Sequence, residues 1–221
     1  MSEVAARTTV LARTAPGESG LVRTLAEIPP AARHNGVSGA GGELWFVVDG
    51  TGELALNGSP GPQLIPGRGL LVPAGTRYAV ASGPDGWLRL DVVALPAGAA
   101  GPATLISRDL RDCPAEVTGD RTFRVLFGPG RDCAVATQFA GDIPPGRAPE
   151  HSHPYDEVVL VLQGTGIAHA GGADRELRPG ACLHLPPGLP HCLENTGSQP
   201  LRVLGVFHPA GSPAAKLPAA D

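Results

Sequence analysis

One internal repeat limits what this chain of 221 residues can fold into more than any other feature. Residues 42–58, GELWFVVDGTGELALNG, share a glutamate, an apolar run and a Gly-Thr-Gly triplet with residues 156–172, DEVVLVLQGTGIAHAGG. Residues 67–82 and 180–195 then share glycine, proline and glycine at the same internal spacing. A repeat of this period is long enough for a small domain. The sequence therefore predicts two domains of the same kind.

Both domains are expected to be built from β-strands. Short apolar runs that are rich in β-branched residues, such as EVVLVL and LRVLGVF, are bounded by Gly or Pro. No long segment has a clean helical period, and the 31 glycines and 24 prolines fit a chain with many turns. The predicted fold class is all-β, with a sandwich or barrel in each domain. We expect one barrel in residues 1–104, a second in 105–210, and a flexible Pro/Ala-rich tail at 211–221.

Charge and composition exclude several classes of partner. The net charge is −4 and the sequence has no basic run, so no nucleic-acid partner is expected. No apolar stretch is long enough for a transmembrane helix, and the N-terminal residues lack the apolar core of a signal peptide. The four cysteines form no CxxC pair and are interpreted as reduced thiols. These features predict a cytoplasmic protein that does not act at a membrane.

A group of metal-ligand residue types stands in the second repeat. His151 and His153 are two residues apart, and Glu157 follows four residues later. In extended chain these side chains share one face, where two imidazoles and a carboxylate suit a first-row transition metal. His191 follows the turn LPPGLP and is the candidate for a fourth ligand from another strand. Three His and one Glu leave open positions on an octahedral ion for a substrate or O₂.

The same two stretches resemble the two motifs of the cupin family. Residues 146–164, GRAPEHSHPYDEVVLVLQG, are similar to the first motif, G-x(4–5)-H-x-H-x(3–4)-E-x(6)-G, with Gly146 one residue closer to His151 than in the commonest form. Residues 180–195, GACLHLPPGLPHCLEN, are similar to the second motif, G-x(5)-P-x-G-x(2)-H-x(3)-N. The resemblance implies a bicupin: two double-stranded β-helix (jelly-roll) barrels in tandem, with a metal at the barrel centre and a homodimer as the common assembly.

The first repeat keeps the scaffold of the motifs and loses most of the ligands. Glu43 matches the ligand glutamate, but Val37 and Gly39 stand where the two motif histidines belong, and Tyr78 stands at the fourth ligand position. A lone carboxylate does not hold a transition metal tightly, so the first barrel is expected to be metal-free. It serves either as a structural half or as a substrate or effector pocket lined by Glu43, Tyr78 and Trp45.

Two further histidines of the second repeat are candidates for catalysis. His169 and His184 lie in or next to predicted strands of this repeat. Each can line the cavity as an acid–base group or a substrate hydrogen-bond donor, or can face outward. Sequence alone does not fix the strand register that decides between these placements.

The ligand set favours an enzyme over a binding protein. The resemblance implies a metal-dependent enzyme that acts on a small organic molecule, and similar bicupins include dioxygenases of the quercetin type. We expect one divalent transition-metal ion per chain, with Fe(II) favoured over Mn, Ni, Cu or Zn. The alternative is a non-redox isomerase, cyclase, lyase or decarboxylase, in which the metal acts as a Lewis acid. A non-catalytic bicupin that binds small molecules is a further alternative, disfavoured by the intact ligands.

Overall fold

The computed structural model describes residues 5–14, 20–99 and 101–215, and the chain forms two compact units. The first unit comprises residues up to Arg13 and Gly20–Asp112, and the second comprises the chain from Cys113 on together with Thr14. The sequence suggested a division between residues 104 and 105. The structural division lies further along because residues 106–109 add a strand to the sheet of the first unit.

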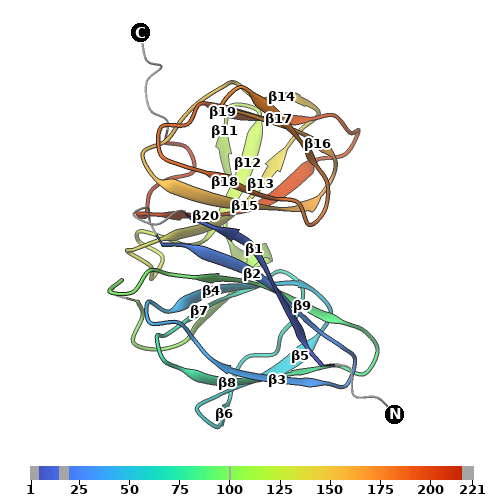
Figure 1. The fold of residues 1–221 in the computed structure, drawn as a ribbon, viewed down its shortest axis with the longest axis vertical. Coiled ribbons are helices and arrows are strands. Elements are labelled where there is room, and N and C mark those ends of the chain that lie inside the picture. Colours follow the sequence, from blue (N-terminus) through green and yellow to red (C-terminus); the bar gives the residue numbers. More distant parts are fainter. Residues whose placement is uncertain (1–4, 15–19, 100, 216–221) are drawn as a thin grey trace. The chain divides into compact units, whose positions relative to one another are not determined.

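The first unit consists of two antiparallel sheets (Figure 1). The order of the larger sheet is β1-β2-β9-β4-β7-β10, and the order of the smaller is β3-β8-β5-β6. The elements of this unit are β1 (Arg7–Arg13), β2 (Val22–Ile28), β3 (Arg33–Val37), β4 (Glu43–Asp49), β5 (Gly52–Leu56), β6 (Ser59–Pro60), β7 (Arg68–Val72), β8 (Arg77–Ser82), β9 (Leu88–Ala94), β10 (Ile106–Asp109) and the 3-10 turn η1 (Leu110–Asp112).

The second unit also consists of two antiparallel sheets. Their orders are β11-β12-β13-β20-β15-β18 and β14-β19-β16-β17. The strands of this unit are β11 (Glu116–Thr118), β12 (Arg121–Phe127), β13 (Thr137–Ile143), β14 (Gly146–Arg147), β15 (Asp156–Gln163), β16 (Gly166–Ala170), β17 (Ala173–Leu177), β18 (Cys182–Leu185), β19 (His191–Asn195) and β20 (Leu201–His208).

The sequence repeat reappears as a repeat of topology. The order β2-β9-β4-β7 in the first unit matches β13-β20-β15-β18 in the second, and β3-β8-β5-β6 matches β14-β19-β16-β17. Even the irregular pairing recurs, because β4 shifts register between Val47 and Asp49 and β15 shifts between Val161 and Gln163. The prediction of an all-β chain with two jelly-roll barrels in tandem is confirmed.

The Gly-Thr-Gly triplet that both units share has a steric cause in each of them. Gly50 and Gly164 follow the shifted pairing and have φ of 78° and 88°, a left-handed conformation that side chains disfavour. A Cβ on Gly50 would lie 2.2 Å from the carbonyl oxygen of Trp87, and a Cβ on Gly164 would lie 2.9 Å from the Cα of Leu201. In both turns the backbone of a neighbouring segment lies too close for a side chain, so glycine is required.

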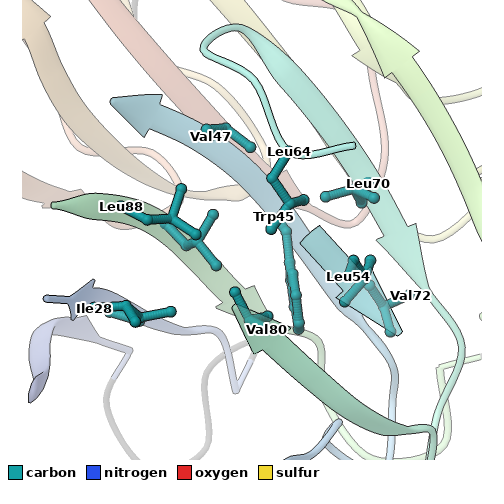
Figure 2. Close-up of a cluster of buried hydrophobic side chains, with 11 residues drawn as sticks. Ile28, Trp45, Val47, Leu54, Leu64, Leu70, Val72, Val80 and Leu88 are labelled. Carbon is teal, nitrogen blue, oxygen red and sulfur yellow. The ribbon is translucent and has the colours of Figure 1, made fainter. Parts of the chain in front are cut away.

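Apolar side chains fill the space between the sheets of each unit. In the first unit the fully buried indole of Trp45 lies at the centre of this cluster (Figure 2). In the second unit the cluster sits around Val159 and Leu185 and leaves space beside it for the site described below. The core of the second unit is formed by Ile143, Val159, Val161, Ala168, Leu177, Leu183, Leu185, Leu201 and Val203.

Within the described ranges, no helix has the length and hydrophobicity that a membrane span requires. All four cysteines are described and none forms a disulfide.

Candidate metal centre

Backbone pairing brings the two sequence motifs together. His151 and His191 form an isolated antiparallel bridge, with N–H···O distances of 3.0 and 2.9 Å in the two directions. The carbonyl of His153 accepts a hydrogen bond of 2.9 Å from the N–H of Gly188, in the turn before His191. Glu157 then lies near the start of β15. The first motif is thus held against the second by main-chain bonds that do not depend on a ligand.

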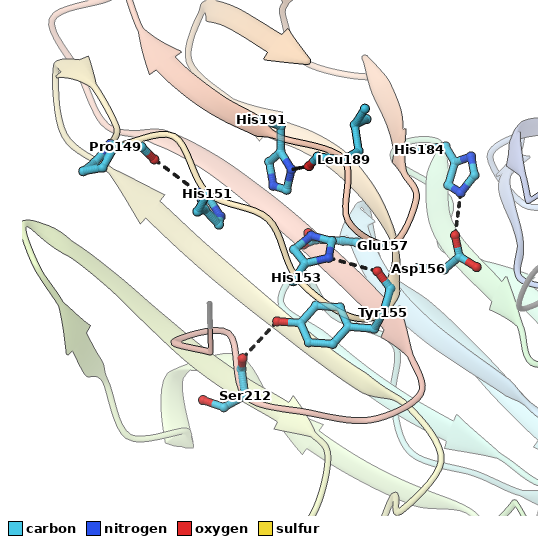
Figure 3. Close-up of polar contacts among 10 residues, drawn as sticks. All are labelled: Pro149, His151, His153, Tyr155, Asp156, Glu157, His184, Leu189, His191 and Ser212. Atoms are coloured by element: carbon cyan, nitrogen blue, oxygen red, sulfur yellow. Dashed lines mark hydrogen bonds and ion pairs between the residues drawn. The ribbon is translucent and has the colours of Figure 1, made fainter. Parts of the chain in front are cut away.

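Three of the four predicted ligands converge on one point (Figure 3). One potential ligand atom from each of His153, Glu157 and His191 lies within 4.8 Å of the others, and all three side chains are buried. His153 Nε2 is 2.8 Å from Glu157 Oε2. His151 lies at the margin of the cluster, with its ring centroid 4.5 Å from that of His191 and 6.4 Å from that of His153.

Main-chain carbonyls orient all three imidazoles in the same way. Nδ1 of His151 lies 3.2 Å from the carbonyl of Pro149, Nδ1 of His153 lies 2.9 Å from that of Tyr155, and Nδ1 of His191 lies 2.8 Å from that of Leu189. A carbonyl oxygen only accepts, so each Nδ1 carries the proton and donates it. In His151 and His191, Nε2 is then the nitrogen with a free lone pair, whereas Nε2 of His153 donates to Glu157 Oε2 and must give up this proton to bind an ion. Orientation of the second ring nitrogen by a carbonyl is typical of metal-binding histidines.

Burial keeps two of the imidazoles in the neutral form that a metal requires. It lowers the pKa of His151 to about 4, assisted by the nearby His191. Burial also lowers the pKa of His191. Burial also acts to lower the pKa of His153, but the hydrogen bond to Glu157 and the negative charge of Glu157 outweigh this effect, so the pKa is raised. Three imidazole nitrogens and one carboxylate oxygen fit a divalent transition ion.

A cavity of about 90 Å³ opens beside these ligands. A space of this volume admits a compact group. Its walls are mainly apolar and aromatic, with few polar groups apart from the cluster. The lining residues that matter here are Arg121, Phe139, Asp142, His151, His153, Tyr155, Glu157, Val159, Leu185, His191, Phe207, Pro213 and Ala215.

Tyr155 is a wall residue that the sequence did not identify. Its ring stacks on His153 at 4.4 Å and on Phe207 at 4.0 Å, and it is almost fully buried. Burial, followed by the charge of Glu157, raises its pKa. The hydroxyl donates to the carbonyl of Ser212 at 3.1 Å. The alternation of polar and apolar residues gives no signal for this position, because residues 152–154 are not in a strand.

The beginning of the predicted tail belongs to the cavity wall. Thr137 Oγ1 donates to the carbonyl of Gly211 at 2.9 Å, and Pro213 and Ala215 line the cavity. Residues 211–215 are therefore fixed against the second unit. The rest of the predicted tail, 216–221, lies outside the described residues.

His184 does not reach the cavity. Glu157 is paired with Leu185 across β15 and β18, so Val158 is paired with His184. Neighbours along a strand face opposite sides, and Leu185 faces the cavity. His184 accordingly lies on the other side, where its Nε2 is 2.9 Å from Asp156 Oδ1 (Figure 3). The geometry does not favour a catalytic role for this residue.

His169 is also away from the cavity, on β16. Its Nδ1 is 2.6 Å from Asp174 Oδ1, and its Nε2 is 2.9 Å from Glu194 Oε2. The hydrogen bonds that His169 donates to Glu194 and Asp174 raise its pKa. It joins β17 and β19 as a cation between two carboxylates, which is a structural role.

This arrangement predicts a pH-dependent contribution of His169 to stability. The pKa is raised in the folded state, so the stabilisation is fully present below the unfolded pKa of about 6.5 and is lost as the pH rises through the folded pKa. His169→Gln should therefore lower the melting temperature more at pH 6 than at pH 9, measured by thermal unfolding with Arg175→Gln as a surface control. An equal loss at both pH values would contradict the ion-pair account.

In the first unit, side chains fill the space that corresponds to the metal centre. Glu43 is buried and accepts hydrogen bonds from Trp45 Nε1 at 2.7 Å and from the N–H of Gly39 at 2.9 Å. Burial raises the pKa of Glu43, against these two bonds. The rings of Trp45 and Tyr78 meet edge to face at 4.8 Å. Trp45 thus contacts both Glu43 and Tyr78, and this packing favours a structural half over a pocket.

A comparison with known protein families agrees with this geometry. The model of the cupin domain matches residues 141–207, which contain all four predicted ligands. The second unit is a cupin domain. The matched residues include β14 to β19 and the segment between β14 and β15, and therefore both motifs.

Similarity to solved structures extends the fold to both units. Oxalate decarboxylase of Bacillus subtilis, whose structure was determined in a study of its Mn(II) centres, has a TM-score of 0.73 at 14% identity, over 97% of this chain and 74% of that one. Protein YlbA of E. coli has a TM-score of 0.75 at 14% identity, over 92% and 82%. At such identities the likeness concerns the fold, which is that of two cupin barrels in tandem.

A curated relative covers a smaller part. An uncharacterized protein of Methanocaldococcus jannaschii is 32% identical over 54 residues, which are 24% of this chain and 43% of that protein. The match thus spans less than half the length of this relative.

Proposed function

We propose that the protein is a metal-dependent enzyme that acts on a small organic molecule in the cavity of its cupin domain. The observation that carries the proposal is the convergence of His153, Glu157 and His191 on one buried point beside a cavity. His151 completes the proposed set, since its Nδ1 is oriented by a carbonyl in the same manner as the other two.

The protein contributes orientation and exclusion of water. The carbonyl bonds to Nδ1 turn Nε2 of three imidazoles toward the ion, which would replace the proton that His153 Nε2 shares with Glu157, and Glu157 supplies one negative charge that partly balances it. The aromatic and apolar wall around Phe139 and Phe207 keeps bulk water from the reacting group. A divalent ion bound there supplies Lewis acidity or, if it is redox-active, chemistry with O₂.

The volume of the cavity restricts the substrate. Pockets for drug-sized ligands measure about 300 Å³ or more, whereas this cavity measures about 90 Å³. A large aromatic substrate of the quercetin type does not fit such a space. We therefore propose a substrate whose reacting part has only a few non-hydrogen atoms.

Oxidative and non-redox chemistry use the same ligands. The dioxygenase proposal rests on the ligand set, and the non-redox proposal is supported by the similarity in fold to oxalate decarboxylase. Consumption of O₂ by the Fe(II)-loaded protein with small organic acids would support the first. Turnover of the same acids at an undiminished rate without O₂ would exclude it and support the second.

Metal analysis tests the proposal itself. The purified protein, reloaded with Fe(II) or Mn(II) and dialysed, is expected to retain close to one ion per chain, because the donor set is preformed and buried. The variant in which both His151 and His153 are replaced by alanine should retain none, as measured by plasma mass spectrometry. Full retention of the ion by this variant would place the metal elsewhere and overturn the assignment.

A further inference from the structure

Arg121 is the most unusual polar residue of the cavity wall. It opens β12 directly after the two-residue turn at 119–120, where Thr118 pairs with Arg121 across the hairpin. It lies in neither metal motif. Its Nε lies 3.8 Å from Oδ1 of Asp120, an ion pair too long for a hydrogen bond, and Asp120 is 66% exposed. Arg121 Nε is buried and has no hydrogen-bond partner among the described residues.

An orphaned buried donor is destabilising unless a ligand satisfies it. A buried polar group without a partner costs about 1–3 kcal/mol, and more when it is charged. Asp142 also lines the cavity, but its two carboxylate oxygens accept hydrogen bonds from Arg202, at 2.7 and 3.0 Å, and not from Arg121. No described carboxylate thus accepts a hydrogen bond from Arg121, although its side chain lines the cavity.

The charges of the cavity favour an anion. Three neutral imidazoles, one carboxylate and a divalent ion carry a net charge of +1, and Arg121 adds another positive charge. Arg121 lines the same cavity as His151 and Glu157, which places the guanidinium charge near the ligand cluster. In a cavity with apolar walls this excess charge is screened little and attracts a negative group.

We propose that Arg121 binds a carboxylate of the substrate, so that the cupin domain acts on small organic acids. This inference rests on the proposed function, because the metal supplies part of the positive charge. Guanidinium donors match the two oxygens of a carboxylate, and the volume of about 90 Å³ admits a compact acid.

Binding of acetate and acetamide to the Mn(II)-loaded protein tests the inference. The two probes have nearly the same shape, and only acetate is charged. By titration calorimetry, Arg121→Gln should weaken acetate binding about 10- to 100-fold, the loss expected for a charged hydrogen bond, and leave acetamide binding nearly unchanged. Arg121→Lys keeps the positive charge but lacks the forked donors of a guanidinium, so its affinity for acetate should lie between those of Arg121→Gln and the unaltered protein. Arg175→Gln, an exposed change on β17, should bind acetate as the unaltered protein does.

Metal content separates the two ways in which the experiment can fail. Removing a positive charge near the ion does not weaken metal binding, so Arg121→Gln should retain close to one Mn(II) per chain. If it does so and binds acetate as tightly as the unaltered protein, or loses acetamide equally, the role of Arg121 is refuted and the proposed function stands. If the unaltered protein itself retains no metal, the proposed function fails and this inference with it.

Discussion

Glu157→Gln is expected to remove the metal from the cupin domain while leaving the fold intact. The amide has the shape of the carboxylate and can keep a hydrogen bond with His153 Nε2, now 2.8 Å from Glu157 Oε2. It lacks the negative charge that balances the ion, and amides are poor ligands for transition metals. Changes outside the ligand shell already cost 10- to 100-fold in metal affinity, so loss of a ligand should cost more than ~100-fold.

The first unit supplies a matched control for this experiment. Glu43 occupies the corresponding position, and its carboxylate accepts from Trp45 and Gly39. Glu43→Gln should therefore leave the metal content unchanged. Metal per chain is measured after dialysis, and circular dichroism checks the fold of both variants. Equal metal loss in the two variants, or retention in Glu157→Gln, would contradict a single site built on Glu157.

The convergence of the proposed metal ligands could be predicted from sequence because their spacing is local. His151, His153 and Glu157 lie within seven residues, and the turn before His191 returns the chain to the same end of the barrel. The structure adds the cause, which is the direct backbone pairing of His151 with His191. Repetition likewise predicted the tandem barrels, since the second copy of each strand and turn repeats the constraints of the first.

The cavity wall could not be predicted in this way. Arg121 comes from β12 and Tyr155 from a segment between strands, and neither has a periodic or motif signal. Pro213 reaches the cavity from the region that composition marked as a flexible tail. Such contacts depend on tertiary packing across long sequence distances. His184 shows a related limit, since a register difference of one residue decides which side of the sheet it faces.

Trp45 of the first unit suggests a substitution that would fill the cavity of the second unit without changing a proposed metal ligand. Val159 is its counterpart, two residues after the matching glutamate, and lines the cavity. A tryptophan at 159 would bring an indole N–H that competes for Glu157, as Trp45 does for Glu43. Phenylalanine adds the bulk without a donor. Val159→Phe should therefore keep the metal and fill the space that the substrate needs.

The expected result for Val159→Phe is a loss of binding or turnover of more than ~100-fold with an unchanged metal content, since displacing a reacting group by about 1 Å can already cost this much. Carboxylate binding to the Mn(II)-loaded protein and turnover of small acids are the measurements. Val117→Phe makes the same change at a position that is 71% exposed and outside the cavity lining, and should affect neither. Overpacking costs about 1–3 kcal/mol, so melting temperatures are compared as well. Undiminished turnover in a folded Val159→Phe variant would mean that the reaction takes place elsewhere, because a phenyl ring at this position and a substrate beside Glu157 require the same space.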